Sequence, residues 1–121
     1  MRLAAALGIP LLLALFAGGA SAVAAPAEVE QSRRDYLQAL RALRAGDPGP
    51  YSSVRARLDG YLLRGYLDYE FLKDRVAATP PETLRRFLED NRDAPVSDLL
   101  RRKWLKHLAG RGQWELFLAE M

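Results

Sequence analysis

The sequence predicts an all-α protein in which short helices form hairpins, arranged as a segment of an α-superhelix (solenoid) or as a small bundle. Three observations lead to this class. Apolar residues recur at spacings of three and four, period-two alternation with β-branched residues is missing, and glycine and proline interrupt the chain at short intervals. A weak internal repeat also supports stacked hairpins. The pair Phe87-Leu88 recurs as Phe117-Leu118 about 30 residues later, and this spacing lies within the range of helix-pair repeats.

The first residues are typical of a secretory signal peptide rather than of the folded domain. A basic start at Met1-Arg2 precedes an uncharged apolar run, which ends in the small residues Ala22-Val23-Ala24. We therefore expect a signal peptide over residues 1–24, with a cut after Ala22 as the alternative, and a mature domain over residues 25–121. An uncleaved membrane anchor is disfavoured, because Gly8 and Pro10 fall inside the apolar run.

Composition narrows the class of protein further. With 121 residues and no cysteine, a single domain without disulfides or a lipid-modified signal is expected. The net charge of +3 is spread too evenly along the chain to indicate nucleic-acid binding. An exported, cysteine-free chain suggests a periplasmic protein that is free of the membrane after signal cleavage.

The first mature helix is predicted over Val29–Arg44. Its buried face follows the i, i+3, i+4, i+7 spacing and consists of Tyr36, Ala39, Leu40 and Leu43. Glu30 lies four residues before Arg34, the favourable order for a surface ion pair. The glycines and prolines of Gly46–Pro50 end the helix.

A second helix is predicted over Pro50–Leu58, with Tyr51, Val54 and Leu58 on one side. The following segment, Leu58–Leu72, is apolar and aromatic on nearly every face, so it requires cover on several sides. Gly60 and Gly65 each weaken a helix here by roughly 1 kcal/mol, which indicates a break or a tight packing contact at each position.

The next helix has the clearest local start signal. In Thr79-Pro80-Pro81-Glu82, the threonine is expected to cap free amides, Pro80 to occupy the first helical position and Glu82 to complete a capping box. The buried stripe behind this start is Leu84, Phe87 and Leu88.

After a turn at Asn91–Pro95, the next helix runs to Gly110 and Gly112, with Asp98 expected to pair with Arg102. Its inward residues are predicted to be Val96, Leu99, Leu100, Trp104 and Leu108. A last helix begins at Gln113, and its apolar stripe is Trp114, Phe117 and Leu118. No helix in the sequence remains to cover that stripe, so we expect further polypeptide of a larger architecture to cover it.

Few residues suggest chemistry. Asp68 and Glu70 are two apart on a helix and point in different directions, which disfavours a catalytic pair. His107 is the only histidine, and with no cysteine present a metal site has too few ligands. We therefore expect no catalytic residue, metal or other cofactor in this chain.

The candidate binding residues lie in the last third of the chain. Five cations, with no acid between Leu99 and Gly112, could contact an anionic polymer such as cell wall, although a solvated helix face explains them more simply. They are Arg101, Arg102, Lys103, Lys106 and Arg111. The apolar residues Trp114 and Phe117 form the second candidate surface, for a neighbouring domain or a protein partner.

The order of these segments resembles the amino-terminal end of the superhelical domain of soluble lytic murein transglycosylases. The most specific match is the WLxxLAxRGxW pattern, Trp104 to Trp114. The remaining matched positions are Tyr36-Leu37, Ala42-Leu43, Gly46-Asp47, Tyr51, Leu58, Tyr61, Leu67, Tyr69, Leu72, Phe87-Leu88, Pro95, Leu100-Arg101 and Phe117-Leu118. Where the family often carries prolines, this chain has Gly60 and Gly65.

This resemblance implies a ring-shaped helical scaffold whose peptidoglycan-cleaving activity belongs to a separate lysozyme-like domain at the carboxyl end. No catalytic residue can be carried over to this chain, so a non-catalytic scaffold role is expected, with peptidoglycan contacted through the parent enzyme. The alternative is a stand-alone periplasmic helical adaptor that binds a protein partner through the Trp114/Phe117 face.

Overall fold

The computed structural model describes residues 26–121, and this part of the chain is helical without a β-strand. Its elements are α1 (Pro26–Arg44), α2 (Gly49–Val54), the short 3₁₀ helix η1 (Arg55–Leu58), α3 (Arg64–Leu72), α4 (Pro81–Asp90), α5 (Pro95–Gly110) and α6 (Trp114–Glu120). The all-α prediction is confirmed. The predicted signal peptide, residues 1–24, and its cleavage site lie outside the described residues.

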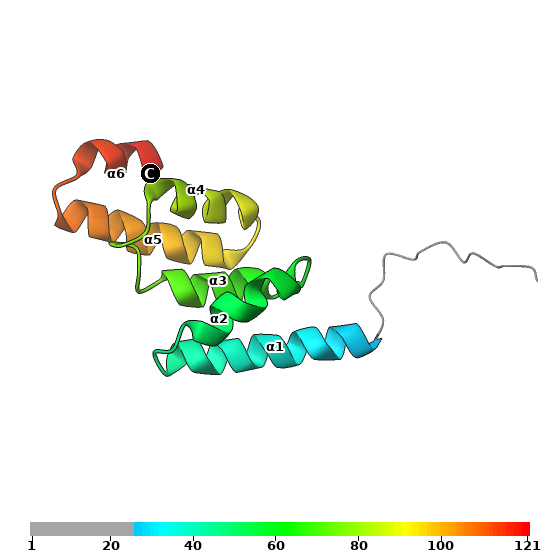
Figure 1. Cartoon of the computed structure of the whole chain (residues 1–121). Helices are drawn as coiled ribbons and strands as arrows, with labels where there is room; N and C mark the ends of the chain where they lie inside the picture. Colours follow the sequence, from blue (N-terminus) through cyan, green and yellow to red (C-terminus); the bar gives the residue numbers. More distant parts are fainter. Residues whose placement is uncertain (1–25) are drawn as a thin grey trace, which may run out of the picture.

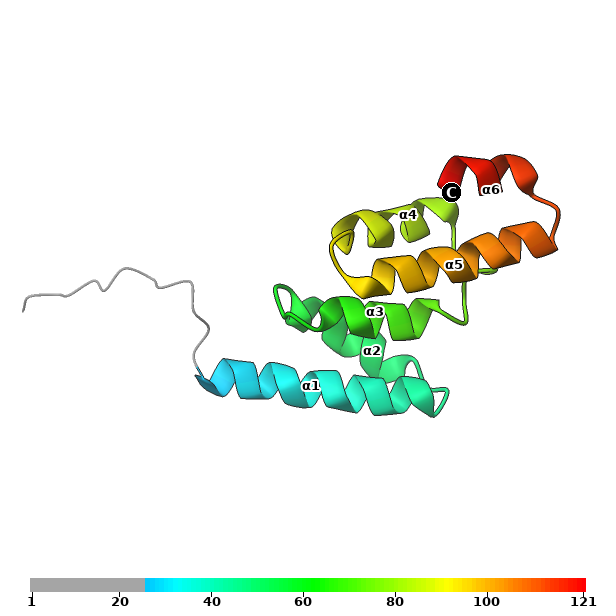
Figure 2. The ribbon, with the colours of Figure 1, turned by 180° about the vertical axis from the view of Figure 1, so that it is seen from behind.

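The helices are layered, as both views show (Figures 1 and 2). Helix α1 forms one end, α2 and α3 follow, α5 lies between α3 and α4, and α6 lies at the other end. Both α3 and α4 pack against α5, and α6 folds back on α5 as the second arm of a hairpin. In residues 26–121, no helix is both long enough and apolar enough to cross a bilayer.

Two groups of buried side chains stabilise these layers. The first, here called the N-terminal cluster, joins α1, α2, η1 and α3 and consists of Ala39, Tyr51, Val54, Leu58 and Leu67. The second, the C-terminal cluster, joins α3, α4 and α5 and consists of Leu72, Leu84, Phe87, Leu88, Val96, Leu100, Trp104 and Leu108. Phe71 on α3 contacts both clusters, so α3 couples the two halves of the molecule.

The two glycines of the apolar segment Leu58–Leu72 have the roles that the sequence predicts. Gly60 has a φ of +76°, a left-handed conformation that side chains disfavour, and it turns the chain between η1 and α3. Gly65 lies inside α3 against Asn91, where a Cβ atom would come within 2.1 Å of the Asn91 Oδ1 atom. The predicted break and the predicted tight contact are therefore both present.

The predicted capping box is wrong. Helix α4 begins at Pro81 with Pro80 at the N-cap, and no side chain caps its free amides. The Thr79 hydroxyl instead donates to the backbone carbonyl of Arg75, 2.6 Å away, at the end of the preceding loop. Two consecutive prolines lack N–H groups, so fewer amides at this helix start need a capping oxygen.

Two predicted surface ion pairs are also wrong, Glu30–Arg34 and Asp98–Arg102. Each acid lies closest to a cation three residues ahead instead, Glu30 with Arg33 at 3.9 Å and Asp98 with Arg101 at 4.0 Å. Both spacings bring side chains together on a helix, so sequence alone does not choose between them.

Two apolar stripes differ from the prediction. Leu99 is 42% exposed and does not belong to the inward face of α5. On α6, the side chains of Leu116 and Phe117 pack against the C-terminal cluster, whereas Trp114 and Leu118 face outward and are 58% and 65% exposed. The predicted stripe thus mixes the inner and outer faces of a short helix.

Candidate functional site

A cleft of about 580 Å³ opens between the α2–α3 side of the molecule and α4. It forms because α3 and α4 both pack against α5 and leave space between them. Charged, amide and aromatic side chains line it: Tyr51, Arg55, Asp59, Tyr61, Arg64, Asp68, Phe71, Arg86, Phe87, Asp90 and Asn91, with Leu62, Gly65, Leu72 and Thr83. Its volume lies in the range of small-molecule sites.

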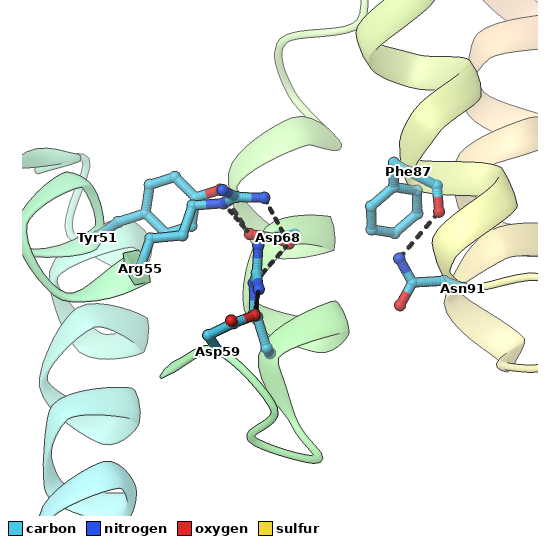
Figure 3. Close-up of polar contacts among 7 residues, drawn as sticks. Tyr51, Arg55, Asp59, Asp68, Phe87 and Asn91 are labelled. Atoms are coloured by element: carbon cyan, nitrogen blue, oxygen red, sulfur yellow. Dashed lines mark hydrogen bonds and ion pairs between the residues drawn. The ribbon is translucent and has the colours of Figure 1, made fainter. Parts of the chain in front are cut away.

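Asp68 is the buried centre of the α3 wall (Figure 3). Its Oδ1 atom accepts a 2.6 Å hydrogen bond from the Tyr51 hydroxyl and a 2.9 Å bond from Arg55 Nε. Arg55 also donates from Nη2 to Oδ2, at 3.4 Å, and Arg64 Nε lies 3.8 Å from the same oxygen. A buried carboxylate requires such partners, and this one is neutralised within the fold.

The second acid of this wall is at the rim. Arg64 donates to Asp59 through Nη1 at 2.7 Å, although the Asp59 side chain is largely exposed. Arg64 therefore connects the rim carboxylate to the buried Asp68. Two arginines and two aspartates balance one another on this side of the cleft.

Tyr51 is held in a protonated state by its surroundings. Burial raises the pKa of Tyr51 well above its usual value, and the hydrogen bond donated to Asp68 raises it further. Its ring stacks on Phe71 at 4.4 Å between centroids. The hydrogen bond to Asp68 also raises the pKa of Arg55. Tyr51 and Arg55 are therefore both held in their protonated forms beside Asp68.

The α4 wall is built differently. Asn91 follows the last residue of α4 and donates from Nδ2 to the Phe87 carbonyl at 2.9 Å (Figure 3). The Asn91 side chain also lies against Gly65 of α3. Arg86 and Asp90, one turn apart on α4, are exposed. Within residues 26–121, neither Arg86 nor Asp90 forms an ion pair or a side-chain hydrogen bond, so both charges are available to a ligand.

The predicted basic residues differ in exposure. Arg102, Lys103 and Lys106 are exposed on α5, while Arg101 is half-buried near Asp98. Arg111 lies past the end of α5 and lines a separate hollow of about 290 Å³ with His107 and Trp104. Arg111 is exposed too, so four of the five predicted cations are exposed.

The predicted apolar surface is divided as well. Trp114 is exposed and lines an open hollow of about 670 Å³ along α6 with Leu116 and Ala119. Phe117 packs inward, although its ring still contacts Trp114 edge-on at 5.6 Å. The exposed large apolar side chains Trp114 and Leu118 of α6, together with Met121 directly after the helix, are here called the α6 face.

Asp68 and Glu70 serve separate ion-pair groups. Glu70 pairs with Lys73 at 2.7 Å and with Arg44 at 3.7 Å, away from the cleft. The described part of the chain contains no cluster of three His, Asp or Glu side chains that could hold a metal ion.

Sequence reasoning missed the cleft itself. Its partners come from distant segments, since Tyr51 lies 17 residues before Asp68 and Arg55 lies 13 residues before it. The available signal was an aspartate in the apolar segment before Leu72, which implies compensating donors without naming them.

No protein-family model, curated protein or solved structure matches this chain.

Proposed function

We propose that the chain is a non-catalytic scaffold segment of the superhelical domain of a periplasmic peptidoglycan lytic transglycosylase. The parent activity would cleave the MurNAc–GlcNAc bond in another domain, and this segment would position or guide the glycan. The single observation that carries the proposal is the α6 face, an apolar surface on the outermost helix of a layered helical molecule. In helical stacks, each such face is covered by the next unit.

Two further features support the scaffold role. The helices are short and joined by tight turns, which suits a stack of hairpins. The exposed cations Arg102, Lys103 and Lys106 lie on α5, which forms a hairpin with α6, and offer a surface for the peptide carboxylates of cell wall.

Co-sedimentation with isolated sacculi tests this function. We expect retention of the purified chain at low salt that falls as salt rises, because exposed charges are screened over about 10 Å at 0.1 M salt. Lys103→Glu with Lys106→Glu should abolish most of the retention. The matched control, Arg33→Glu with Arg34→Glu, reverses two exposed charges on α1 and should leave retention unchanged.

Retention that is absent, or that ignores both salt and the charge reversal, would contradict the guidance role. Turbidity of the sacculi should stay constant, because the catalytic domain is separate. A loss of turbidity that Glu70→Gln removes would identify an independent glycosidase instead.

A stand-alone adaptor is the second candidate, and the same α6 face favours it. The reading frame downstream of Met121 separates the two. An open frame that continues into a lysozyme-like domain supports the scaffold, whereas a stop codon supports the adaptor.

A further inference from the structure

We propose that the cleft between α3 and α4 binds a small zwitterion, an amino acid or a short peptide, whose carboxylate contacts Arg86 and whose ammonium contacts Asp90. This inference does not depend on the scaffold function, because it uses residues of the cleft alone.

Charge balance selects the ligand class. On the α3 wall, Asp68 takes hydrogen bonds from Arg55 and an ion pair from Arg64, which also binds Asp59. These four groups neutralise one another. The other two charged groups of the cleft, the Arg86 guanidinium and the Asp90 carboxylate on α4, are not neutralised in this way. A simple anion bound to Arg86 would be repelled by Asp90, and a simple cation bound to Asp90 would be repelled by Arg86. A ligand that carries both charges complements both groups.

The spacing of the two groups supports this ligand. Residues four apart on a helix have Cβ atoms roughly 5–6 Å apart, so two opposite charges of one small molecule can reach both. Arg86 precedes Asp90, which is the less favourable order for an internal ion pair, and the two do not pair with each other. A guanidinium can also bind a carboxylate with two parallel hydrogen bonds.

The rest of the cleft suits a short peptide. Leu62 is 90% exposed at the rim and can cover an apolar side chain, while Thr83 offers a hydroxyl for a peptide group. The cleft volume of about 580 Å³ accommodates a ligand of two or three residues.

Titration of the full chain, residues 1–121, with glycylglycine tests the proposal by ¹⁵N amide NMR. We expect saturable shifts at α4 and at the facing residues of α3. Arg86→Gln and Asp90→Asn should each weaken binding about fivefold or more, as expected when a charged hydrogen bond is lost. The control, Arg41→Gln, removes an exposed arginine of α1 that does not line the cleft, and this variant should bind as the unchanged chain does.

Probes that lack one charge provide the decisive comparison. N-acetylglycylglycine lacks the ammonium and should bind weakly, with no further loss in Asp90→Asn. Glycylglycine amide lacks the carboxylate and should be insensitive to Arg86→Gln. Inorganic phosphate should not displace glycylglycine.

Three results would overturn the proposal. One is the absence of shifts at α4. Another is any sign of a simple anion site. Such a sign would be that N-acetylglycylglycine binds as tightly as glycylglycine, or that phosphate displaces glycylglycine by binding to Arg86 alone. The third is an equal loss in the Arg41→Gln control, which would indicate non-specific attraction. Far-UV circular dichroism of each variant verifies folding, and both cleft positions are exposed, so the helices should persist.

Discussion

Asp68 illustrates how single residues set the character of the cleft. Its carboxylate is buried on α3, yet Tyr51 and Arg55 supply hydrogen bonds within 3 Å. Because a buried charge without partners is very unfavourable, these residues act as one group. Removing any one of them should affect the stability of the whole N-terminal cluster.

Tyr51→Phe should lower stability at neutral pH by about 1 kcal/mol, the usual net value of a hydrogen bond. The pKa of Tyr51 is raised in the folded state, so the stabilisation is complete below its ordinary value of 10.0 and is lost as pH rises above it. Urea unfolding at about pH 8 and at about pH 11 measures how far the unfolding free energy falls between the two pH values. This fall should be larger for the unchanged protein than for Tyr51→Phe.

The control for this substitution is Tyr66→Phe, at a tyrosine that is 42% exposed and bonds to no side chain within residues 26–121. It should retain the alkaline fall of the unchanged protein. An identical fall in Tyr51→Phe would mean that Tyr51 does not contribute to the alkaline loss of stability.

At the scale of elements, the contact between α3 and the end of α4 depends on one glycine. Gly65→Ala would force the Asn91 side chain to turn away and give up its hydrogen bond to the Phe87 carbonyl. Gly110→Ala, where a Cβ atom meets nothing within 4 Å, gains the same helix propensity without that loss. Gly65→Ala should therefore be less stable than Gly110→Ala by about 1 kcal/mol.

Chemical denaturation of the two variants measures this difference. Asn91→Ala provides the further control, because the hydrogen bond is then already absent. In that background, Gly65→Ala and Gly110→Ala should have equal unfolding free energies. A difference that persists there would show that the close contact at Gly65 involves more than Asn91.

For the whole molecule, Phe71 is the connection between the two core clusters. Phe71→Ala should cost about 2 kcal/mol, below the value for a fully buried phenylalanine because Phe71 is half-buried. It should also separate the unfolding of the two halves. In a Trp114→Phe background, Trp104 fluorescence reports the C-terminal cluster and far-UV circular dichroism reports all helices.

The two unfolding curves should coincide in the background protein and diverge once Phe71 is replaced. Leu62→Ala, at a side chain that is 90% exposed, is the control and should change neither curve. Coincident curves in Phe71→Ala would mean that other contacts are sufficient to couple the clusters.

The α6 face is the second feature at this scale. Trp114→Ser with Leu118→Ser should change the unfolding free energy by less than about 0.5 kcal/mol, because both side chains are largely exposed. The same variant should bind less of an apolar dye and associate less at high concentration. Phe117→Ser, on the inner side of α6, should destabilise the protein instead. Equal destabilisation by both changes would show that the α6 face is already covered.

Much of the helical organisation could be predicted from local pattern. The spacing of Ala39 and Leu43 identified the buried side of α1, and Gly60 identified the turn before α3, because period and glycine conformation are properties of short segments. The inward face of α5 at Leu100, Trp104 and Leu108 followed from the same rule. On the seven residues of α6, too few turns existed for the pattern to separate Phe117 from Leu118.

By itself, then, the sequence determined the helical class, the positions of most turns and which residues could be buried, since these depend on neighbours within one or two turns of helix. Only the tertiary structure decided which polar groups meet. Tyr51, Arg55 and Asp68 converge from three elements, Gly65 meets Asn91 across a contact between helices, and Arg86 and Asp90 face a cleft that no single helix forms. The physical reason is that helix packing, rather than local spacing, determines which distant side chains lie within hydrogen-bonding distance.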